Sequence, residues 1–325
     1  MTLAASVTAG GAAYWCWRDL RTGLVPPAGG VLVTIGPGES FRRICERLES
    51  AGVVRYGAVL RLWARWQGVD RLVRSGEYRF DRALSPIDVL AVLRSPSAAV
   101  HWVTIREGAT VADVAAVLAV AGFGGTDHVQ CLARDPSFLV DVDVPASGLE
   151  GYLFPDTYAF AWSASPEEIL RAMVRRFREH AAAVAPARAA ARMSEAEMVI
   201  LASVIEKETG AALERPVVSG VFHNRLRIGM ALQSDPTAVY GRTDVARPTA
   251  ADLKVDNPYN TYRHAGLPPG PICNPGRAAL EAAVTPAQVP YLYFVSRNDG
   301  THEFSATLAA HNRAVARYQR RRGAP

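Results

Sequence analysis

The chain contains very little lysine. Of its 36 basic residues only two, Lys207 and Lys254, are lysines, which leaves 34 arginines. Arginine and lysine differ in shape and hydration, so a lysine at position 207 of an arginine-dominated chain indicates a site that needs an ammonium group. The sequence also lacks a basic patch with interleaved aromatic residues, which argues against nucleic-acid binding. The net charge of +5 suits an anionic polymer or an anionic membrane face instead.

Residues that bind metals are also sparse. The four cysteines are Cys16, Cys45, Cys131 and Cys273, and none lies in a C-x-x-C pair. No two of the seven histidines are four residues apart, the spacing of two metal ligands on one helix face. A pyridoxal-phosphate lyase with Lys207 as the Schiff base would need a phosphate cradle, and no glycine-rich loop opens a helix near that lysine. We therefore predict no metal ion and no cofactor.

The first 17 residues carry no charged side chain. This stretch is at the short limit for a membrane span, and its many small residues make it weakly hydrophobic. Tyr14, Trp15 and Trp17 stand beside Arg18, an arrangement typical of the membrane interface. We predict an anchor and linker over residues 1–29, with a single N-terminal transmembrane helix and the rest of the chain outside the cytoplasm. The alternative is a buried N-terminal helix of a soluble protein.

A strand–turn–helix pattern occurs twice in the next part of the chain. Residues 33–52 and 103–122 each begin with a strand-like run, pass through a glycine turn and a Ser or Thr N-cap, and end at Ala-Gly. Between them, residues 76–80 predict a strand, and Pro86 follows the N-cap Ser85 of another helix. The pattern predicts a small binding or spacing module over residues 30–146, without a catalytic signature of its own.

Residues 194–210 read as one buried helix. Ser194 and Glu197 form a capping box, and Gly210 is a plausible left-handed stop. Every residue from Met198 to Ile205 is apolar except Ser203. A helix that is apolar nearly all round belongs in the core of a domain.

Three charged residues, Glu206, Lys207 and Glu208, occupy the last turn of this helix. At about 100° per residue, Glu206 falls between Ala202 and Val199 on the apolar surface. A carboxyl there faces apolar side chains and the negative end of the helix dipole, so we expect its pKa to be raised. A raised pKa suits a general acid near neutral pH. The alternative is a solvated Glu-Lys-Glu run at an exposed helix end.

Tyrosine and asparagine concentrate on proline-stiffened loops downstream of Gly210. Examples are Tyr259, Asn260 and Tyr262, and the proline-rich segment 266–276. Aromatic faces stack on sugar rings, and amide side chains bond hydroxyl and acetamido groups. Each such run alone is usually only a turn, but together they favour a carbohydrate site beside the charged helix end.

Several separated motifs, in order, resemble the YceG-like endolytic murein transglycosylases, the MltG family. The resemblance covers nearly the whole chain. The matching segments are LEGYLFPDTY at 149–158, ASVIEKETG at 202–210, NRL at 224–226 with GM at 229–230, LQSDPT at 232–237, YNTY at 259–262, GLPPG at 266–270, and YLYFV at 291–295 with His302 and Phe304.

The resemblance implies an α+β protein: a small LysM-like α/β module, then a mixed α/β catalytic domain over residues 147–325, after the N-terminal transmembrane helix. It implies a plasma-membrane enzyme that cuts inside nascent peptidoglycan glycan strands outside the cytoplasm, with the cell-wall synthesis machinery as its protein partners. The catalytic glutamate of the family maps onto Glu206. Residues expected to line the cleft or tune the catalyst are Glu150, Tyr152, Lys207, Glu208, Gln233, Asp235, Tyr259, Asn260 and Tyr262.

One carboxyl is enough for this chemistry, whereas ordinary glycosidases usually need two. Glu206 would protonate the oxygen that leaves muramic acid C1 and then take the proton of the C6 hydroxyl of the same sugar. That hydroxyl closes a 1,6-anhydro ring, with the rate advantage of an internal nucleophile. The competing hypothesis is a non-enzymatic peptidoglycan-binding or cell-wall synthesis scaffold, which predicts that Glu206→Gln keeps all function.

Overall fold

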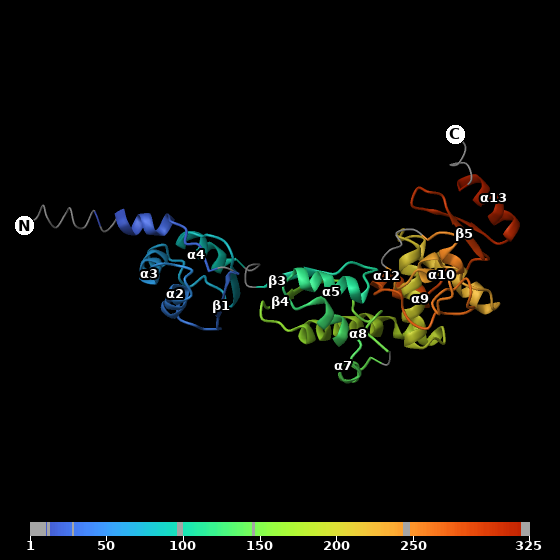
Figure 1. The fold of residues 1–325 in the computed structure, drawn as a ribbon, viewed down its shortest axis with the longest axis horizontal. Coiled ribbons are helices and arrows are strands. Elements are labelled where there is room, and N and C mark those ends of the chain that lie inside the picture. Colours follow the sequence, from blue (N-terminus) through green and yellow to red (C-terminus); the bar gives the residue numbers. More distant parts are fainter. Residues whose placement is uncertain are drawn as a thin grey trace, which may run out of the picture. The chain divides into compact units, whose positions relative to one another are not determined.

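The computed structural model describes residues 11, 14–27, 29–95, 100–144, 147–242 and 248–319. Two compact units divide the chain (Figure 1). The N-terminal unit comprises Met1–Val103 and Tyr158–Ala164, and the C-terminal unit comprises Thr104–Thr157 and Ser165–Pro325. Each unit has its own buried core and is described by itself.

The N-terminal unit is built around a two-stranded antiparallel sheet. Strand β1 (Val31–Ile35) pairs with β2 (Gly76–Phe80), with Val31 opposite Phe80 and Ile35 opposite Gly76. Alternate side chains of each strand point into the core, as the period of two in a strand requires. Helices α2 (Phe41–Ser50), α3 (Gly57–Trp66) and α4 (Pro86–Arg94) add their buried leucines, Leu48, Leu60 and Leu93, to the same cluster.

Both predicted strand–turn–helix repeats are present. Gly38 and Gly108 have φ angles of 71° and 74°, a left-handed conformation that favours glycine. The N-caps that follow, Ser40 and Thr110, accept hydrogen bonds from the third residue of their helices. The second repeat runs from β3 (His101–Thr104), which pairs with β4 (Thr157–Phe160), into α5 (Val111–Val120).

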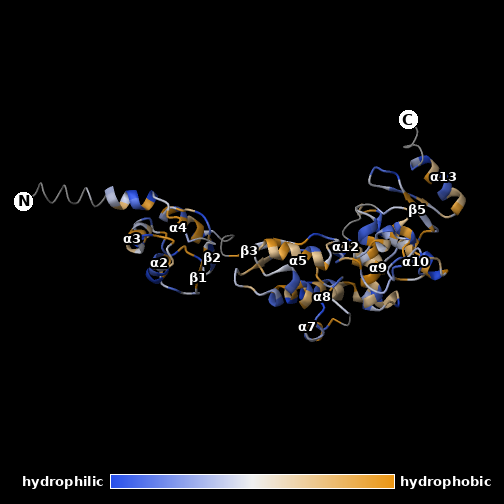
Figure 2. Cartoon of the chain, in the orientation of Figure 1, coloured by the Kyte–Doolittle hydropathy of each residue, from blue (hydrophilic) through white to orange (hydrophobic). Residues whose placement is uncertain are grey.

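The C-terminal unit is mainly helical and surrounds α9 (Glu195–Glu208). Helix α9 packs against α8 (Pro166–Ala190), α10 (Arg215–Arg227), α11 (Asp235–Ala238) and α12 (Arg277–Val284). Its capping box at Ser194 and its buried stretch from Met198 to Ile205 match the prediction. Figure 2 shows the apolar residues along α9 and its neighbours.

Short elements complete this unit. They are α6 (Thr126–Leu132), α7 (Pro136–Asp141), the 3₁₀ helix η2 (Asp252–Lys254), the antiparallel hairpin of β5 (Tyr293–Ser296) and β6 (His302–Ser305), and α13 (Leu308–Tyr318). The sequence pattern predicts a hairpin with strands at 291–295 and 301–304 and a turn at 298–300, followed by a last helix from about 307 to 321, and both elements are confirmed. Small antiparallel sheets among helices confirm the α+β class, whereas the LysM-like character of the module stays a prediction.

Two local predictions were wrong. Helix α9 ends at Glu208, and Thr209 follows it in an extended conformation with φ −141°, so Gly210 is no left-handed stop. The sequence pattern predicts a helix from about Pro166 to His180, but this helix continues to Ala190, because the alanine-rich stretch has high helix propensity and tolerates Pro186. Helices α3, α6 and α7 were not predicted.

The compact units divide the chain differently from the predicted modules. The predicted module reaches residue 146, whereas the structural division falls between Val103 and Thr104. The second repeat is tied into the C-terminal unit by the hydrogen bond from the Asn274 N–H to the Ala109 carbonyl, 2.8 Å, and by the bond from the Val111 N–H to Glu150.

The predicted transmembrane helix lies mostly outside the described residues. Of the stretch without charged side chains, positions 1–10, 12 and 13 are not described, and residues 14–21 are helical. In the part of the chain that the structure describes, no helix has the length and apolar character needed to cross a membrane.

Candidate acid–base site

The end of helix α9 delivers three charged side chains to three different surroundings. The apolar body of the helix is held in the core, so the orientation of its last turn is fixed by packing. Successive residues point about 100° apart. Glu206, Lys207 and Glu208 therefore contact separate groups of residues.

The Glu206 carboxyl is nearly sequestered, with 5% of its side chain exposed. Its Oε1 atom accepts a hydrogen bond from Arg215 Nη2 at 3.0 Å, and Oε2 accepts one from the Gly276 N–H at 2.9 Å. A carboxylate oxygen has two lone pairs, so each oxygen keeps one for a substrate. The sequence predicted apolar surroundings only, and this was incomplete, because a guanidinium also lies against the carboxyl.

Arg215 links Glu206 to a second carboxyl, that of Glu107. The Arg215 side chain is 10% exposed, and its Nη2 atom lies 3.6 Å from Glu107 Oε2, while its Nε atom has no hydrogen-bond partner among the described residues. A Cβ atom at Gly276 would lie only 2.0 Å from Glu107 Oε1, so the half-exposed Glu107 carboxyl rests directly on that glycine. Neither Glu107 nor Arg215 was predicted from the sequence. Glu107 stands in the turn of the second repeat, and Arg215 opens α10.

A second carboxyl cluster surrounds Glu150. Its oxygens accept hydrogen bonds from the Val111 N–H at the start of α5, from Asn274 Nδ2 at 3.2 Å and from the Tyr240 hydroxyl at 3.0 Å. Burial raises the pKa of Glu150 to about 7, against the effect of these hydrogen bonds. Glu150, Tyr240 and Tyr259 line a cavity of about 410 Å³. The cavity therefore offers a carboxyl and two phenol rings, the latter 4.6 Å apart, to a polar ligand.

Glu208 forms a third cluster with the loop that follows α10. Its Oε1 atom accepts a short hydrogen bond from the Ser234 hydroxyl. Burial raises the pKa of Glu208 to about 7, with a further rise from Asp235 and an opposing effect from the buried Arg225 guanidinium. The Arg225 guanidinium donates to the Leu292 carbonyl, just before β5, and to the Leu232 carbonyl in this loop, which ties the β5 hairpin to the loop.

Glu208→Gln is expected to stabilise the C-terminal unit at alkaline pH. A glutamate with a pKa of about 7 when folded and about 4.3 when unfolded keeps its proton in the folded state over the interval between these values. Stability is therefore lost as pH rises through that interval. Glutamine lacks this loss, so the variant should match the parent near pH 4.5 and exceed it by roughly 3 kcal/mol at pH 8.

Urea unfolding at both pH values tests this. Far-UV ellipticity follows the mainly helical C-terminal unit, while tryptophan fluorescence reports the N-terminal unit, where all six tryptophans lie. The fluorescence midpoint should not change in the variant. A variant whose ellipticity midpoint falls equally at both pH values would contradict a buried, proton-retaining Glu208.

Gln233 and Asp235 flank Ser234 and are exposed, Gln233 in the loop and Asp235 at the start of α11. Gln233 has a φ angle of 50°, which is uncommon for a residue with a side chain and recurs at functional sites. The Asp235 carboxylate accepts a hydrogen bond of 2.6 Å from the Tyr262 hydroxyl. Burial and this bond raise the pKa of Tyr262, which therefore stays a phenol. These three predicted residues are brought together on one surface.

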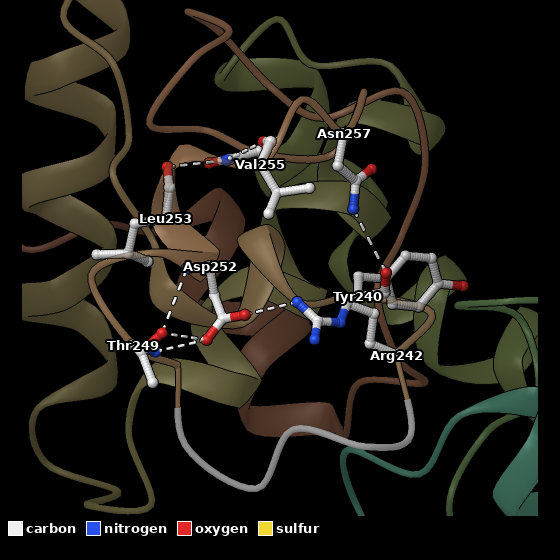
Figure 3. Close-up of polar contacts among 8 residues, drawn as sticks. Tyr240, Arg242, Thr249, Asp252, Leu253, Val255 and Asn257 are labelled. Carbon is white, nitrogen blue, oxygen red and sulfur yellow. Dashed lines mark hydrogen bonds and ion pairs between the residues drawn. The ribbon is translucent and has the colours of Figure 1, made fainter.

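Lys207 is exposed and lines another cavity, of about 330 Å³, with Asp235 and Tyr240. Tyr240 forms part of both cavities. Figure 3 shows how the chain around Tyr240 is held: the Asn257 amide donates to the Tyr240 carbonyl, and Asp252 accepts from Arg242 at 2.6 Å. Hydrogen bonds from Thr249 and this ion pair lower the pKa of Asp252 to about 2.

Tyr152 and Asn260, also predicted to line the cleft, are buried, and Tyr152 contributes to the wall of the cavity beside Glu150. Tyr152 packs edge-on against Phe177, and burial raises its pKa. The Asn260 amide donates to the Leu253 and Val255 carbonyls at 3.1 and 2.8 Å. These contacts give Asn260 a positioning role in its loop. Among the described residues, no three Cys, His, Asp or Glu side chains form a group suited to a metal ion.

Known proteins resemble this chain in both sequence and structure. The profile of the YceG-like family matches residues 33–317. The "Endolytic murein transglycosylase" of Bacillus subtilis (strain 168) is 30% identical over 305 residues, 89% of this chain and 84% of that protein. A protein of the same name from Streptococcus pneumoniae serotype 2 is 28% identical over 321 residues, and the match spans 89% of this chain but only 58% of that relative. The crystal structure of a putative YceG-like protein from Listeria monocytogenes, 30% identical, has a TM-score of 0.64 and covers 87% of this chain and 98% of the other.

A buried carboxyl held by a guanidinium and a backbone N–H at the end of a core helix is an arrangement that acid–base enzymes use. With the profile match over most of its length, the chain belongs to the YceG-like family. The resemblance inferred from the separated motifs is thereby confirmed.

Proposed function

We propose that this protein cleaves the MurNAc–GlcNAc bond inside peptidoglycan glycan strands and leaves 1,6-anhydro-MurNAc ends. Relatives named endolytic murein transglycosylase match most of this chain, which makes it a lytic transglycosylase. The observation that carries the catalytic assignment is the Glu206 carboxyl, sequestered yet hydrogen-bonded on both oxygens.

The proposed reaction needs only one carboxyl. Protonated Glu206 gives its proton to the glycosidic oxygen as the bond from muramic acid C1 to that oxygen breaks. The carboxylate then accepts the proton of the C6 hydroxyl while the C6 oxygen forms its bond to C1. Glu206 thereby regains its proton, and no water is consumed. The acetamido group of the substrate stabilises the intervening cation.

The donors to Glu206 favour its second role. Arg215 and the Gly276 N–H both stabilise the ionised carboxylate and fix its orientation. The ionised carboxylate is the form that receives the C6 proton. Exposed Gln233 and the Asp235–Tyr262 pair are proposed to bond sugar hydroxyls, and Glu150 and Tyr259 to line a further part of the cleft. Lys207 and Glu208 are proposed to tune the site, and Tyr152 and Asn260 to hold the segments that form it.

Product chemistry tests the proposal. The full chain is incubated with purified peptidoglycan, and the products are analysed by mass spectrometry beside the Glu206→Gln variant. Anhydro-muramic ends from the parent, and none from the variant, are expected. Reducing ends would instead indicate hydrolysis and a second carboxyl, and no product from a folded parent would favour a non-enzymatic scaffold.

Arg215→Gln is expected to lower the cleavage rate by about 100-fold and to move the pH–rate profile toward higher pH. The variant leaves the buried Glu206 carboxylate without its cation, so the form that receives the C6 proton is less stable. Initial rates on peptidoglycan between pH 5 and 9 measure both effects.

Two matched variants separate this role from general loss of charge. Arg277→Gln removes an exposed arginine that pairs with Glu281 on α12, and it should leave the profile in place. Glu107→Gln removes the more distant, half-exposed partner of Arg215 and should change the rate only a few-fold. An Arg215→Gln variant with the parental pH profile would show that Arg215 does not act on the proton transfer.

A further inference from the structure

The N-terminal unit exposes a group of large apolar side chains that its core does not use. On α3, Gly57, Leu60 and Ala64 face inward and are buried. Leu62 and Trp66 point outward, 70% and 73% exposed. A helix normally has only one apolar face, which packs on the core, so the second one on α3 needs another explanation.

The helical segment 14–21 extends this outward face. Tyr14, Trp15 and Trp17 are all exposed, and the Trp15 ring lies 4.8 Å from that of Tyr56, just before α3. An almost entirely apolar groove of about 460 Å³ lies between the two elements and is lined by Trp17, Leu62, Trp63 and Trp66. We call these residues, with Tyr14 and Trp15, the aromatic surface. Contiguous exposed apolar patches of this kind mark sites of interaction.

Positive charge surrounds the aromatic surface. Segments 14–21 and 55–66 contain five arginines and one acidic residue, Asp19, which is buried. The Arg21 guanidinium lies 4.5 Å from the centre of the Trp17 ring, a cation–π contact. In this position the charged group can remain hydrated while the aromatic ring below it contacts an apolar phase.

We propose that the aromatic surface seats the N-terminal unit on an anionic lipid bilayer. Tryptophan and tyrosine prefer the headgroup level of a bilayer, and arginines beside them attract anionic lipids. Continuity along the chain supports the same occupant, because the stretch of residues 1–17 without charged side chains leads directly into this surface. The proposal concerns the folded unit, and it holds whether or not the chain cleaves peptidoglycan.

Hydroxyl-radical footprinting of the full chain tests the proposal residue by residue. The protein is labelled alone, with phosphatidylglycerol vesicles and with phosphatidylcholine vesicles, and oxidation is read by mass spectrometry. Phosphatidylglycerol should lower the oxidation of Leu62 and Trp66 at least about fivefold. Trp102 and Leu72, similarly exposed in the same unit at 54% and 52%, serve as internal controls and should react as before.

A pair of variants gives an independent measurement. Leu62→Ser with Trp66→Ser should weaken sedimentation with phosphatidylglycerol vesicles by about tenfold. Val120→Ser with Val140→Ser removes two even more exposed apolar side chains, from the C-terminal unit, and should change nothing.

Several outcomes would overturn the proposal. Vesicle binding with Leu62 and Trp66 still fully reactive would assign binding to other residues. Equal protection by phosphatidylcholine would remove the role of the arginines. Protection that appears without lipid and grows with protein concentration would make the surface a contact between copies of this chain. Absence of binding to either vesicle would favour a protein partner.

Discussion

Glu206→Gln is expected to lower the rate of peptidoglycan cleavage at least about 1000-fold, because general acid and general base catalysis are lost together. Glutamine has the same shape but neither gives nor takes the proton. The glutamine side-chain oxygen can still accept a hydrogen bond from Arg215, and the Gly276 N–H then faces the side-chain NH₂ group. The expected cost in stability is on the order of 1 kcal/mol. Initial rates of anhydro-end formation measure the effect.

Two other glutamates serve as controls for this result. Glu281→Gln removes an exposed carboxyl on α12 and should retain the parental rate. Glu208→Gln, two residues along α9, should keep a measurable rate because Glu208 bonds Ser234 and does not contact Arg215 or Gly276 in any hydrogen bond of the described structure. A folded Glu206→Gln protein that retains a tenth of the parental rate would exclude Glu206 as the catalytic group.

Local signals in the sequence predicted the local structure well. The capping box of α9, the Pro at the start of α4 and the glycine turns of the repeat act between neighbours in the chain, so their residue types are sufficient to locate them. Helix α3 was missed because its N-cap Tyr56 makes no side-chain hydrogen bond and its sequence is apolar on two sides. Helix α6, capped by Gly125, lacks the same signal.

The candidate site was only half predictable. The position of Glu206 follows from the period of its own helix. Arg215, however, reaches Glu206 from α10, and Glu107 reaches Arg215 from the turn of the second repeat. No short-range pattern encodes that meeting, which depends on how helices pack. The same holds for Asn274, whose N-P-G context reads as a turn, whereas its side chain is fully buried and bonds two distant segments.

Asn274→Ala is expected to destabilise the C-terminal unit by about 4 kcal/mol, among the largest effects of any single change. Asn274 Oδ1 accepts from the N–H groups of Gly151 and Leu153, both at 2.9 Å, and Nδ2 donates to the Ala109 carbonyl and to Glu150. Alanine leaves two buried N–H groups without an acceptor, at about 1–3 kcal/mol each, and adds a small cavity. Urea unfolding followed by far-UV ellipticity measures the loss.

Asn274→Asp distinguishes lost hydrogen bonds from lost volume. Aspartate keeps both acceptor contacts to Gly151 and Leu153 but sets a carboxyl against Glu150 in place of a donor. Two neighbouring carboxyls resist joint ionisation, so this variant should be nearly as stable as the parent at pH 5 and lose stability steeply as pH rises to 8. Asn312→Ala, at an exposed position of α13, should stay within about 0.5 kcal/mol of the parent. If Asn274→Ala lowers the free energy of unfolding no more than that control does, Asn274 does not stabilise the link between the turn of the second repeat and the segment that carries Glu150. The geometry around Glu206 must then be held by the packing of α9 and α12 alone.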